Sequence, residues 1–197
     1  MEFQTLNNGI KIPVLGFGVW QIFDQKECQK AVEDALSVGY RLIDTASLYR
    51  NEEAVGRAIK ASGIPREDIF LTSKAWISQL GYEDTKLALK ETLRKLDTDY
   101  LDLYLIHQPF GDLHGAWRAM IELKHEELIR AIGVSNCFAW QIARANEIAK
   151  NNGWATFQSI QGHYNLIFRE EEREMKPYCD LMGVSMTPYS SLASGRL

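Results

Sequence analysis

The sequence has few cysteines and no apolar stretch long enough to cross a membrane. Its three cysteines, Cys28, Cys137 and Cys179, are far apart and form no C-x-x-C pair, which argues against a disulfide framework and a zinc site. We expect them to be buried thiols. No apolar run approaches the ~18 residues of a transmembrane helix, and the N-terminus lacks the basic and apolar regions of a signal peptide. These absences predict a cytoplasmic protein that does not contact membranes.

The sequence also lacks an excess of positive charge and two common catalytic motifs. It has 22 Lys and Arg against 26 Asp and Glu, with the basic residues scattered, so we expect no nucleic-acid partner. Gly16 and Gly18 are followed by Val-Trp-Gln rather than by the rest of G-x-G-x-x-G, which argues against a Rossmann dehydrogenase. The four histidines show no metal-ligand spacing, and His125-Glu126 lacks the second histidine of H-E-x-x-H. We expect no metal site.

What the chain does have is a regular alternation of apolar and amphipathic segments. The 197 residues are 46% hydrophobic, enough for one sizeable core, and we expect 1–197 to form a single domain. Apolar runs of strand length alternate with amphipathic runs of helix length, which predicts a parallel sheet. An N-terminal hairpin, 3–6 and 10–14, is expected around an Asn-Asn-Gly turn. The expected strands are 14–20, 40–45, 69–75, 100–107, 129–135, 157–161 and 184–189, and the expected helices are 27–38, 51–61, 82–96, 116–126, 140–150 and 169–182.

Several of these strands are apolar on both faces, as strands covered by helices on one side and a core on the other should be. Two architectures fit this pattern, an open doubly wound sheet and an eight-fold barrel, and periodicity alone does not separate them. Polar residues interrupt the strands at their carboxyl ends. In chain order these are Asp44, Lys74, His107, Ser135 with Asn136, Gln161 and Tyr189. In a parallel barrel such ends converge on one face, where the active site lies.

The residue types at these strand ends suit proton transfer. A buried carboxylate and ammonium at neighbouring strands are costly unless paired, so we expect an ion pair between Asp44 and Lys74. Tyr49 follows Asp44 by five residues, and a nearby ammonium should lower its pKa below the usual value of ~10, as suits a general acid. His107 would donate a hydrogen bond to a substrate oxygen. Each residue also has a purely structural interpretation, as a loop cap, a strand-end lysine or a core histidine, but successive strand ends favour the functional one.

Six motifs in family order resemble the aldo-keto reductase family, and they cover essentially the whole chain. They are 16–20 (GFGVW), 39–46 (GYRLIDTA) with Tyr49, 52–56 (EEAVG), 71–74 (LTSK), 102–107 (DLYLIH) and 132–136 (IGVSN). The resemblance implies a (β/α)8 barrel that reduces aldehydes, ketones or keto-sugars with NADPH. It also implies a catalytic tetrad of Asp44, Tyr49, Lys74 and His107, in which Tyr49 gives the proton and the nicotinamide gives the hydride.

The same resemblance implies the binding residues. Ser135, Asn136 and Gln161 would hold the nicotinamide carboxamide, Tyr189 would stack on its ring, and the segment after it would wrap the pyrophosphate. The full set of cofactor-binding residues is Gly18, Val19, Trp20, Asp44, Ser135, Asn136, Gln161, Tyr189, Ser190, Leu192 and Ser194. The substrate-binding set is Trp20, Tyr49, Trp76, His107 and Phe110. The aromatic residues among them also suit half-buried structural anchors.

The two parts of the chain resemble different branches of the family. The N-terminal part, with 106–111 (IHQPFG) and 115–118 (GAWR), resembles the reductases of diketogluconate and methylglyoxal. After about residue 137 the motifs 161–165 (QGHYN) and 168–175 (FREEEREM) are more similar to the potassium-channel β-subunit-like reductases. This predicts a mosaic of two branches. Glu127 departs from both, because it stands where the family usually has a helix-ending glycine, so we expect a strained left-handed residue there.

Leu197 falls just after the seventh expected strand, so we expect a barrel truncated at that point. In the family, the residues that grip the adenosine 2′-phosphate and close the substrate pocket come later. The missing strand should leave two open sheet edges and promote self-association. A fragment, a deletion variant and a barrel completed by a second copy all fit. The first functional hypothesis is therefore an NADPH-dependent carbonyl reductase, and the alternative is a catalytically weak nucleotide-binding or interaction protein, similar to the channel β-subunits, or an inactive fragment.

Overall fold

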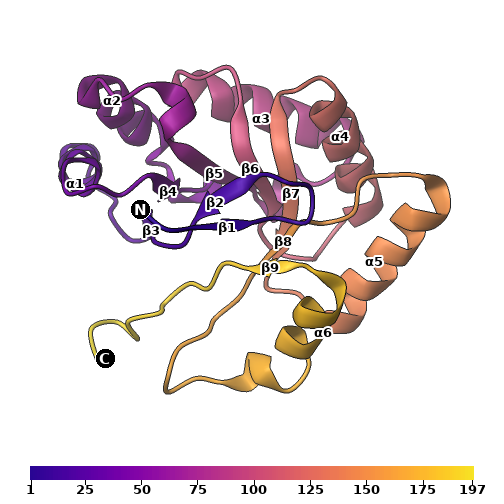
Figure 1. Cartoon of the computed structure of the whole chain (residues 1–197). Coiled ribbons are helices and arrows are strands. Elements are labelled where there is room, and N and C mark those ends of the chain that lie inside the picture. The colour runs from indigo at the N-terminus through magenta and orange to yellow at the C-terminus, as the bar shows by residue number, and fades with distance from the viewer.

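The computed structural model describes all residues from 1 to 197 and contains two sheets, a short hairpin and a curled parallel sheet. In the hairpin, β1 (Phe3–Thr5) pairs antiparallel with β2 (Lys11–Pro13). The parallel sheet has seven strands that pair in chain order, so that each strand lies beside the next in the sequence (Figure 1). These are β3 (Gly16–Gly18), β4 (Leu42–Asp44), β5 (Phe70–Ala75), β6 (Leu101–Ile106), β7 (Ile129–Ser135), β8 (Ser159–Gln161) and β9 (Ser185–Met186).

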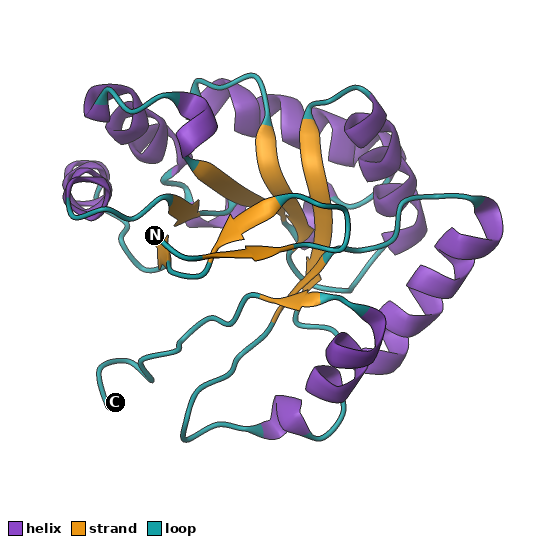
Figure 2. Cartoon of the chain, viewed as in Figure 1, coloured by secondary structure: helices purple, strands orange, loops and turns teal.

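Helices follow the strands and lie along the outside of the curled sheet (Figure 2). They are α1 (Gln25–Ser37), α2 (Glu52–Ser62), α3 (Tyr82–Leu96), α4 (Leu113–His125), α5 (Ala139–Asn152) and α6 (Met175–Met182). Single 3-10 turns occur at η1 (Ser47–Tyr49), η2 (Arg66–Asp68), η3 (Ile77–Gln79) and η4 (Glu170–Glu172). The Asp24 carboxylate accepts hydrogen bonds from two backbone N–H groups and starts α1, whereas left-handed Gly63, Gly153 and Gly183 end α2, α5 and α6. None of the helices is long and apolar enough to span a membrane.

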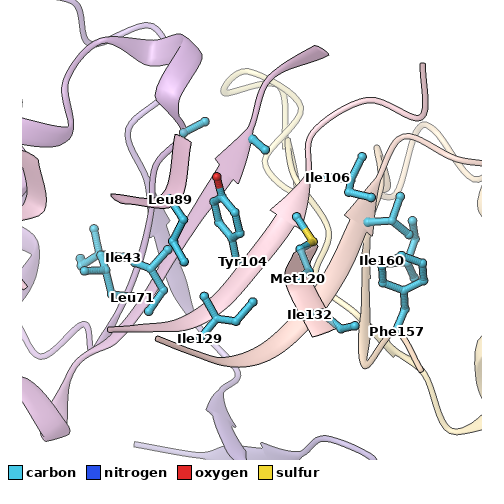
Figure 3. Close-up of a cluster of buried hydrophobic side chains, with 14 of the residues drawn as sticks. Ile43, Leu71, Leu89, Tyr104, Ile106, Met120, Ile129, Ile132, Phe157 and Ile160 are labelled. Carbon is cyan, nitrogen blue, oxygen red and sulfur yellow. The ribbon is translucent and has the colours of Figure 1, made fainter. Parts of the chain in front are cut away.

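The core divides into two clusters because the strands are apolar on both faces. The larger cluster lies between the sheet and the helices. Figure 3 shows Tyr104 and Ile132 of the sheet beside Met120 of α4. The smaller cluster lies inside the curl, where the hairpin packs against β5, β6 and β7. Its buried members are Leu6, Ile12, Phe70, Leu103, Leu105 and Ala131. The hairpin therefore plugs one end of the barrel and leaves the carboxyl ends of the strands at the other.

The structure confirms the order and type of the expected elements and corrects one helix. The expected helix 169–182 is instead the turn η4 followed by α6. Pro177 explains the break, because it lacks a backbone N–H and fits in the first turn of a helix but not in its interior. A helix that began at residue 169 would place Pro177 near its middle. Starting at Met175 puts the proline in the first turn of α6.

The first and last strands of the parallel sheet are shorter than expected. β3 covers three residues of 14–20, and β9 covers two residues of 184–189, with a separate bridge between His163 and Tyr189 further on. The backbone N–H groups of Thr187 and Tyr189 still donate to the carbonyls of Ile160 and Gly162, both at 2.9 Å, so the missing N–H of Pro188 falls on the side without a neighbouring strand. Because β3 and β9 each pair on one side only, the two open edges expected from the sequence are present. Glu127 has a φ of 61°, which confirms the left-handed residue expected after α4.

Candidate active site

The candidate catalytic residues come together at the carboxyl ends of neighbouring strands. Asp44 is the last residue of β4, and Lys74 is the last but one of β5. His107 directly follows β6, and its backbone N–H donates to the carbonyl of Ala75 at 3.0 Å. The parallel register thus places three side chains that are far apart in the sequence at one mouth.

Lys74 and Asp44 form the expected ion pair. The Lys74 side chain is fully buried, and its Nζ contacts Asp44 Oδ1 and donates to the Thr45 carbonyl at 2.9 Å. The second oxygen of Asp44 accepts a hydrogen bond from Gln161 Nε2 at 2.9 Å. Burial lowers the pKa of Lys74, and the Asp44 charge opposes this effect. The carboxylate therefore favours the ammonium form of a lysine side chain that has no exposed surface.

Tyr49 is held over this pair by the turn η1. Ser47, two residues earlier, donates to the carbonyl of Lys74 at 3.0 Å and lies 2.6 Å from Gln79 Oε1. Tyr49 OH lies 3.5 Å from Lys74 Nζ, and its ring centroid is 5.5 Å from that of His107. Together with Asp44, these contacts bring all four residues of the expected tetrad into one cluster.

The expected depression of the Tyr49 pKa is wrong. Burial raises the pKa of Tyr49 above its ordinary value, and the negative charge of Asp44 acts in the same direction. The Lys74 ammonium is close enough to oppose this, but Asp44 neutralises most of its field, and burial outweighs what remains. Tyr49 is consequently protonated at neutral pH, which is the state that a proton donor requires.

His107 is buried and neutral. Burial and the nearby Lys74 charge lower the pKa of His107 from 6.5 to about 3. Its Nδ1 is buried without a hydrogen-bond partner, and its ring packs edge-on against Trp76 with centroids 5.1 Å apart. A neutral imidazole carries one N–H donor and one acceptor. His107 can therefore orient a substrate oxygen without protonating it.

The residues expected to hold the nicotinamide carboxamide are also adjacent. Asn136 has a φ of 56°, and its Nδ2 donates to the His107 carbonyl at 3.1 Å and to Ser135 Oγ at 2.9 Å. Tyr189 OH donates to Asn136 Oδ1 at 3.0 Å. Gln161 lies beside Asn136, whose backbone N–H donates to the Gln161 carbonyl at 3.0 Å. One side of the mouth is thus lined with amide and hydroxyl groups.

Left-handed backbone is concentrated around this mouth. Of the eight non-glycine residues with positive φ, six lie in loops that follow the carboxyl ends of strands: Gln21, Arg50, Asn136, Ser190, Ala193 and Ser194. Such residues cost free energy and tend to gather at binding sites. In the segment 190–195, the backbone N–H groups of Ala193 and Gly195 donate to the carbonyls of Ser190 and Leu192, both at 2.9 Å, which forms successive turns. Ser190, Leu192 and Ser194, expected at the pyrophosphate, lie in this exposed segment.

Aromatic side chains surround the opposite side of the mouth. The Trp20 ring lies 4.7 Å from that of Tyr49, and 51% of Trp20 is exposed. Trp76 lies on His107, whereas Phe110 is 61% exposed and makes no ring contact with the tetrad. The structure adds Phe23, which packs edge-on against Trp20 with centroids 6.0 Å apart. Gly18 ends β3, and Val19 donates its backbone N–H to the Asp44 carbonyl at 3.1 Å.

Asn51 is a further residue of the site that the sequence analysis missed. Its buried Nδ2 donates to the carbonyls of Val19 at 2.9 Å and Ile22 at 3.1 Å, and its Oδ1 accepts from Thr45 Oγ1 at 2.9 Å. The side chain therefore ties the loop of Trp20 to the segment that carries Tyr49. Its position before α2 resembles an ordinary helix cap, although the side chain makes no capping bond. An asparagine two residues after the candidate acid was the signal available.

The three cysteines do not contribute to the site. Cys28 and Cys179 are buried and Cys137 is half-buried, and all three are free thiols. Burial raises the pKa of Cys28 to about 11 and the pKa of both Cys137 and Cys179 to about 12. Thiols of this kind are unreactive at neutral pH.

Comparisons with known proteins agree with this geometry. Residues 14–197 match the Aldo/keto reductase family. The chain is 40% identical over 193 residues to a protein of Bacillus subtilis named glyoxal reductase, covering 98% of this chain and 68% of that protein. The structure superposes on an aldo/keto reductase of Brucella melitensis with a TM-score of 0.90 at 42% identity, over 98% of this chain and 73% of that one. A Bombyx mori aldo-keto reductase in complex with NADP gives a TM-score of 0.87 at 33% identity, over 96% and 66%.

These matches confirm the resemblance seen in the motifs and the expected barrel fold. The chain spans about two thirds of the length of these relatives, in line with a sheet of seven strands. The division into two family branches stays a prediction. Together, the motifs, the curled parallel sheet and the pairwise matches show that the chain belongs to the aldo/keto reductase family, a family of NADP-dependent oxidoreductases.

Proposed function

We propose that this chain reduces a small aldehyde or ketone to the alcohol with NADPH, with Tyr49 as the proton donor. One observation carries the proposal. The Tyr49 hydroxyl lies 3.5 Å from a fully buried ammonium, Lys74, which is itself paired with Asp44. The Tyr49 hydroxyl is protonated before the reaction, because its pKa is raised. When it loses its proton, the nearby Lys74 ammonium stabilises the phenolate.

Each member of the tetrad has a distinct task in this proposal. The neutral His107 donates a hydrogen bond that orients the substrate oxygen between its ring and that of Tyr49. Tyr49 then donates its proton to that oxygen, and Lys74 stabilises the phenolate that is left. Asp44 keeps Lys74 charged in a buried site that would otherwise favour the neutral amine. NADPH, when bound, supplies the hydride.

The residues present fit a nicotinamide nucleotide. Asn136, Ser135 and Gln161 present amide and hydroxyl groups beside the tetrad, and the half-exposed ring of Tyr189 presents a flat face. The hydroxyl groups of Ser190 and Ser194 lie in an exposed segment with left-handed residues and can donate hydrogen bonds to a pyrophosphate. These features support assigning the cofactor-binding role to the residues named from the sequence.

The walls of the mouth favour a small and uncharged carbonyl compound. Trp20, Trp76 and Phe23 are aromatic, and the one ammonium of the cluster, Lys74, is engaged by Asp44. A substrate carboxylate would have no free cation among these groups. The similarity to a glyoxal reductase supports the same choice, and we propose small dicarbonyls such as methylglyoxal ahead of keto-sugars.

The test follows NADPH absorbance with methylglyoxal and with a nitrobenzaldehyde as substrates. Tyr49→Phe should lower kcat/KM by about 10²- to 10⁴-fold and leave NADPH binding unchanged, because only the proton donor is lost. Tyr40→Phe is the matched control. Tyr40 lies just before the amino end of β4, away from Asp44 at the carboxyl end, and packs on Phe17. Equal activity of Tyr49→Phe and the control would contradict the assignment. NADPH binding without turnover on any carbonyl would instead favour a nucleotide-binding protein.

We also propose that residues 1–197 form one domain that associates through its open edges. One continuous apolar cluster runs from Val19 to Val184, and β3 and β9 each have an unpaired side. Chemical denaturation should show a single transition by both circular dichroism and tryptophan fluorescence. Sedimentation velocity should show a larger species as the protein concentration rises. A monomer at every concentration would refute the association.

A further inference from the structure

Three aromatic rings form a column behind the mouth of the site. The rings of His163 and Tyr189 lie nearly parallel, at 9°, with centroids 5.4 Å apart. His163 also stacks on Phe168, with an angle of 15° between the ring planes and 4.3 Å between the ring centroids. Offset stacks at these distances are favourable arrangements of aromatic rings. His163 therefore links Tyr189 to Phe168, although neither the fold nor the tetrad requires an aromatic residue at position 163.

Asn165 fixes the orientation of the His163 ring. Its Oδ1 accepts hydrogen bonds from the backbone N–H groups of Ile167 at 3.0 Å and Phe168 at 2.8 Å. These two donors identify the oxygen end of the side-chain amide. Its Nδ2 therefore faces His163 Nε2 at 3.3 Å and donates to it. Because Nε2 accepts, the hydrogen-bond network assigns the neutral imidazole with its proton on Nδ1. The same Nδ2 donates to the Ser190 carbonyl at 3.0 Å.

The column is connected to the candidate cofactor site through Tyr189. The backbone pairs at His163 and Tyr189, and the Tyr189 N–H donates to the Gly162 carbonyl at 2.9 Å. At the far end of the side chain, the Tyr189 hydroxyl donates to Asn136 Oδ1. Burial and the Glu171 carboxylate raise the pKa of Tyr189, so that it is a donor at neutral pH. The ring is thus held at its hydroxyl and along one face, while 40% of the residue is exposed.

We propose that His163 is a positioning residue that sets the plane of the Tyr189 ring, and through it the affinity for the nicotinamide nucleotide. The proposal rests on the function proposed above, in which Tyr189 packs against the nicotinamide. Tyr189 lies three residues beyond β9, and its backbone is held by pairing with residues 162–164, but this pairing does not fix the plane of its ring. The stack on His163 supplies that constraint. Without the stack, the hydroxyl contact with Asn136 holds the end of the ring, and the ring can rotate to other orientations.

Three variants separate the ring of His163 from its hydrogen bond. His163→Phe keeps a flat aromatic ring and removes the acceptor for Asn165. His163→Gln keeps an acceptor and removes the ring, and His163→Ala removes both. The control is His114→Ala, since His114 also packs on an aromatic residue, Trp154, but lies on α4 away from Tyr189.

The position of Tyr189 is measured first, without cofactor, by fluorine NMR with 3-fluorotyrosine incorporated at position 189. His163→Ala and His163→Gln should shift and broaden the signal, whereas His163→Phe and the control should leave it close to that of the parent protein. An unchanged signal in His163→Ala overturns the proposal. This result does not depend on any activity, so it separates the failure of the proposal from the failure of the proposed function.

Titration of NADPH then tests the consequence for binding. Loss of the ring in His163→Ala and His163→Gln should weaken NADPH binding by about 3- to 10-fold, the range expected for one aromatic pair. His163→Phe should bind within about twofold of the parent protein, because the pair is kept. KM for the carbonyl at saturating NADPH should not change in any variant. Equal weakening by Phe and Ala would assign the effect to the Asn165 hydrogen bond and overturn the role of the stack.

Discussion

The two halves of the mouth are built in different ways. Around β4, β5 and β6, buried hydrogen bonds and an ion pair between neighbouring strands hold Asp44, Lys74 and Tyr49. Around β8 and β9, half-exposed rings and left-handed loop residues hold Tyr189 and the segment after it. In the proposed function, charge develops in the first half during proton transfer, and a rigid frame favours this step. The second half, in the same proposal, presents an adaptable surface to a cofactor that has to enter and leave. The comparison predicts that changes in the first half affect the chemical step and stability, whereas changes in the second affect binding.

Lys74→Met should have the largest effect. It leaves the Asp44 carboxylate without its cation, and breaking such a buried pair costs about 3–5 kcal/mol of unfolding free energy. It also removes the charge that stabilises the Tyr49 phenolate, so kcat should fall by about 10²-fold or more. Urea denaturation and steady-state kinetics measure the two effects. Lys86→Met is the control, because the Lys86–Glu122 pair is solvent-accessible and should contribute little to stability.

His107 should make the protein sensitive to acid. Its pKa is about 3 in the folded state against 6.5 as the ordinary value, so the unfolded chain binds one more proton between these pH values. Stability contributed by the neutral, buried histidine is present above about pH 6.5 and is lost as the pH falls, by up to about 1.4 kcal/mol per pH unit. His107→Asn should flatten this part of the curve of unfolding free energy against pH. A slope equal to that of the parent protein would show that other groups are responsible.

Tyr189→Ala should weaken NADPH binding by about 10-fold and leave the fold nearly intact, because a half-exposed ring contributes little to the core. In the comparison between the two halves, this is the counterpart of Lys74→Met. Fluorescence titration gives the affinity, and thermal unfolding gives the stability. A loss of more than about 3 kcal/mol would place Tyr189 with the rigid half instead.

Glu127→Gly should have the smallest effect and should stabilise the protein. Glu127 is left-handed at the end of α4, far from the mouth, and relieving such a conformation contributes about 1 kcal/mol. Asn136→Gly relieves a similar φ but also removes the amide that contacts Tyr189, so it should weaken NADPH binding. Thermal unfolding and NADPH titration of both variants distinguish the two cases. Backbone strain at Glu127 should affect stability alone, whereas the strained Asn136 should also contribute to NADPH binding.

Most of the first half could be predicted from the sequence, and less of the second. Asp44, Lys74 and His107 are polar residues at the ends of apolar strands. The parallel pairing of these strands is enough to bring the three side chains together. The direction of the Tyr49 pKa shift could not be predicted, because it depends on how burial and the two opposite charges balance. The break before α6 was foreseeable from Pro177, but the charged run before it has helical spacing.

The residues that were missed act through contacts that no spacing reveals. Asn51 has three partners, two of them on the loop after β3, and His163 stacks on a residue 26 positions later in the chain. A single polar or aromatic residue in a loop carries no periodic signal. Its role follows only from the fold that brings its partners together.

The most direct test of the central claim is to follow deuterium from NADPH labelled at the transferable position of the nicotinamide into the alcohol formed from methylglyoxal. The account predicts labelled alcohol with the parent protein and at least about 10²-fold less with Tyr49→Phe, with NADPH still bound. Equal labelling in both proteins, or bound NADPH with no labelled alcohol from the parent protein, would contradict it.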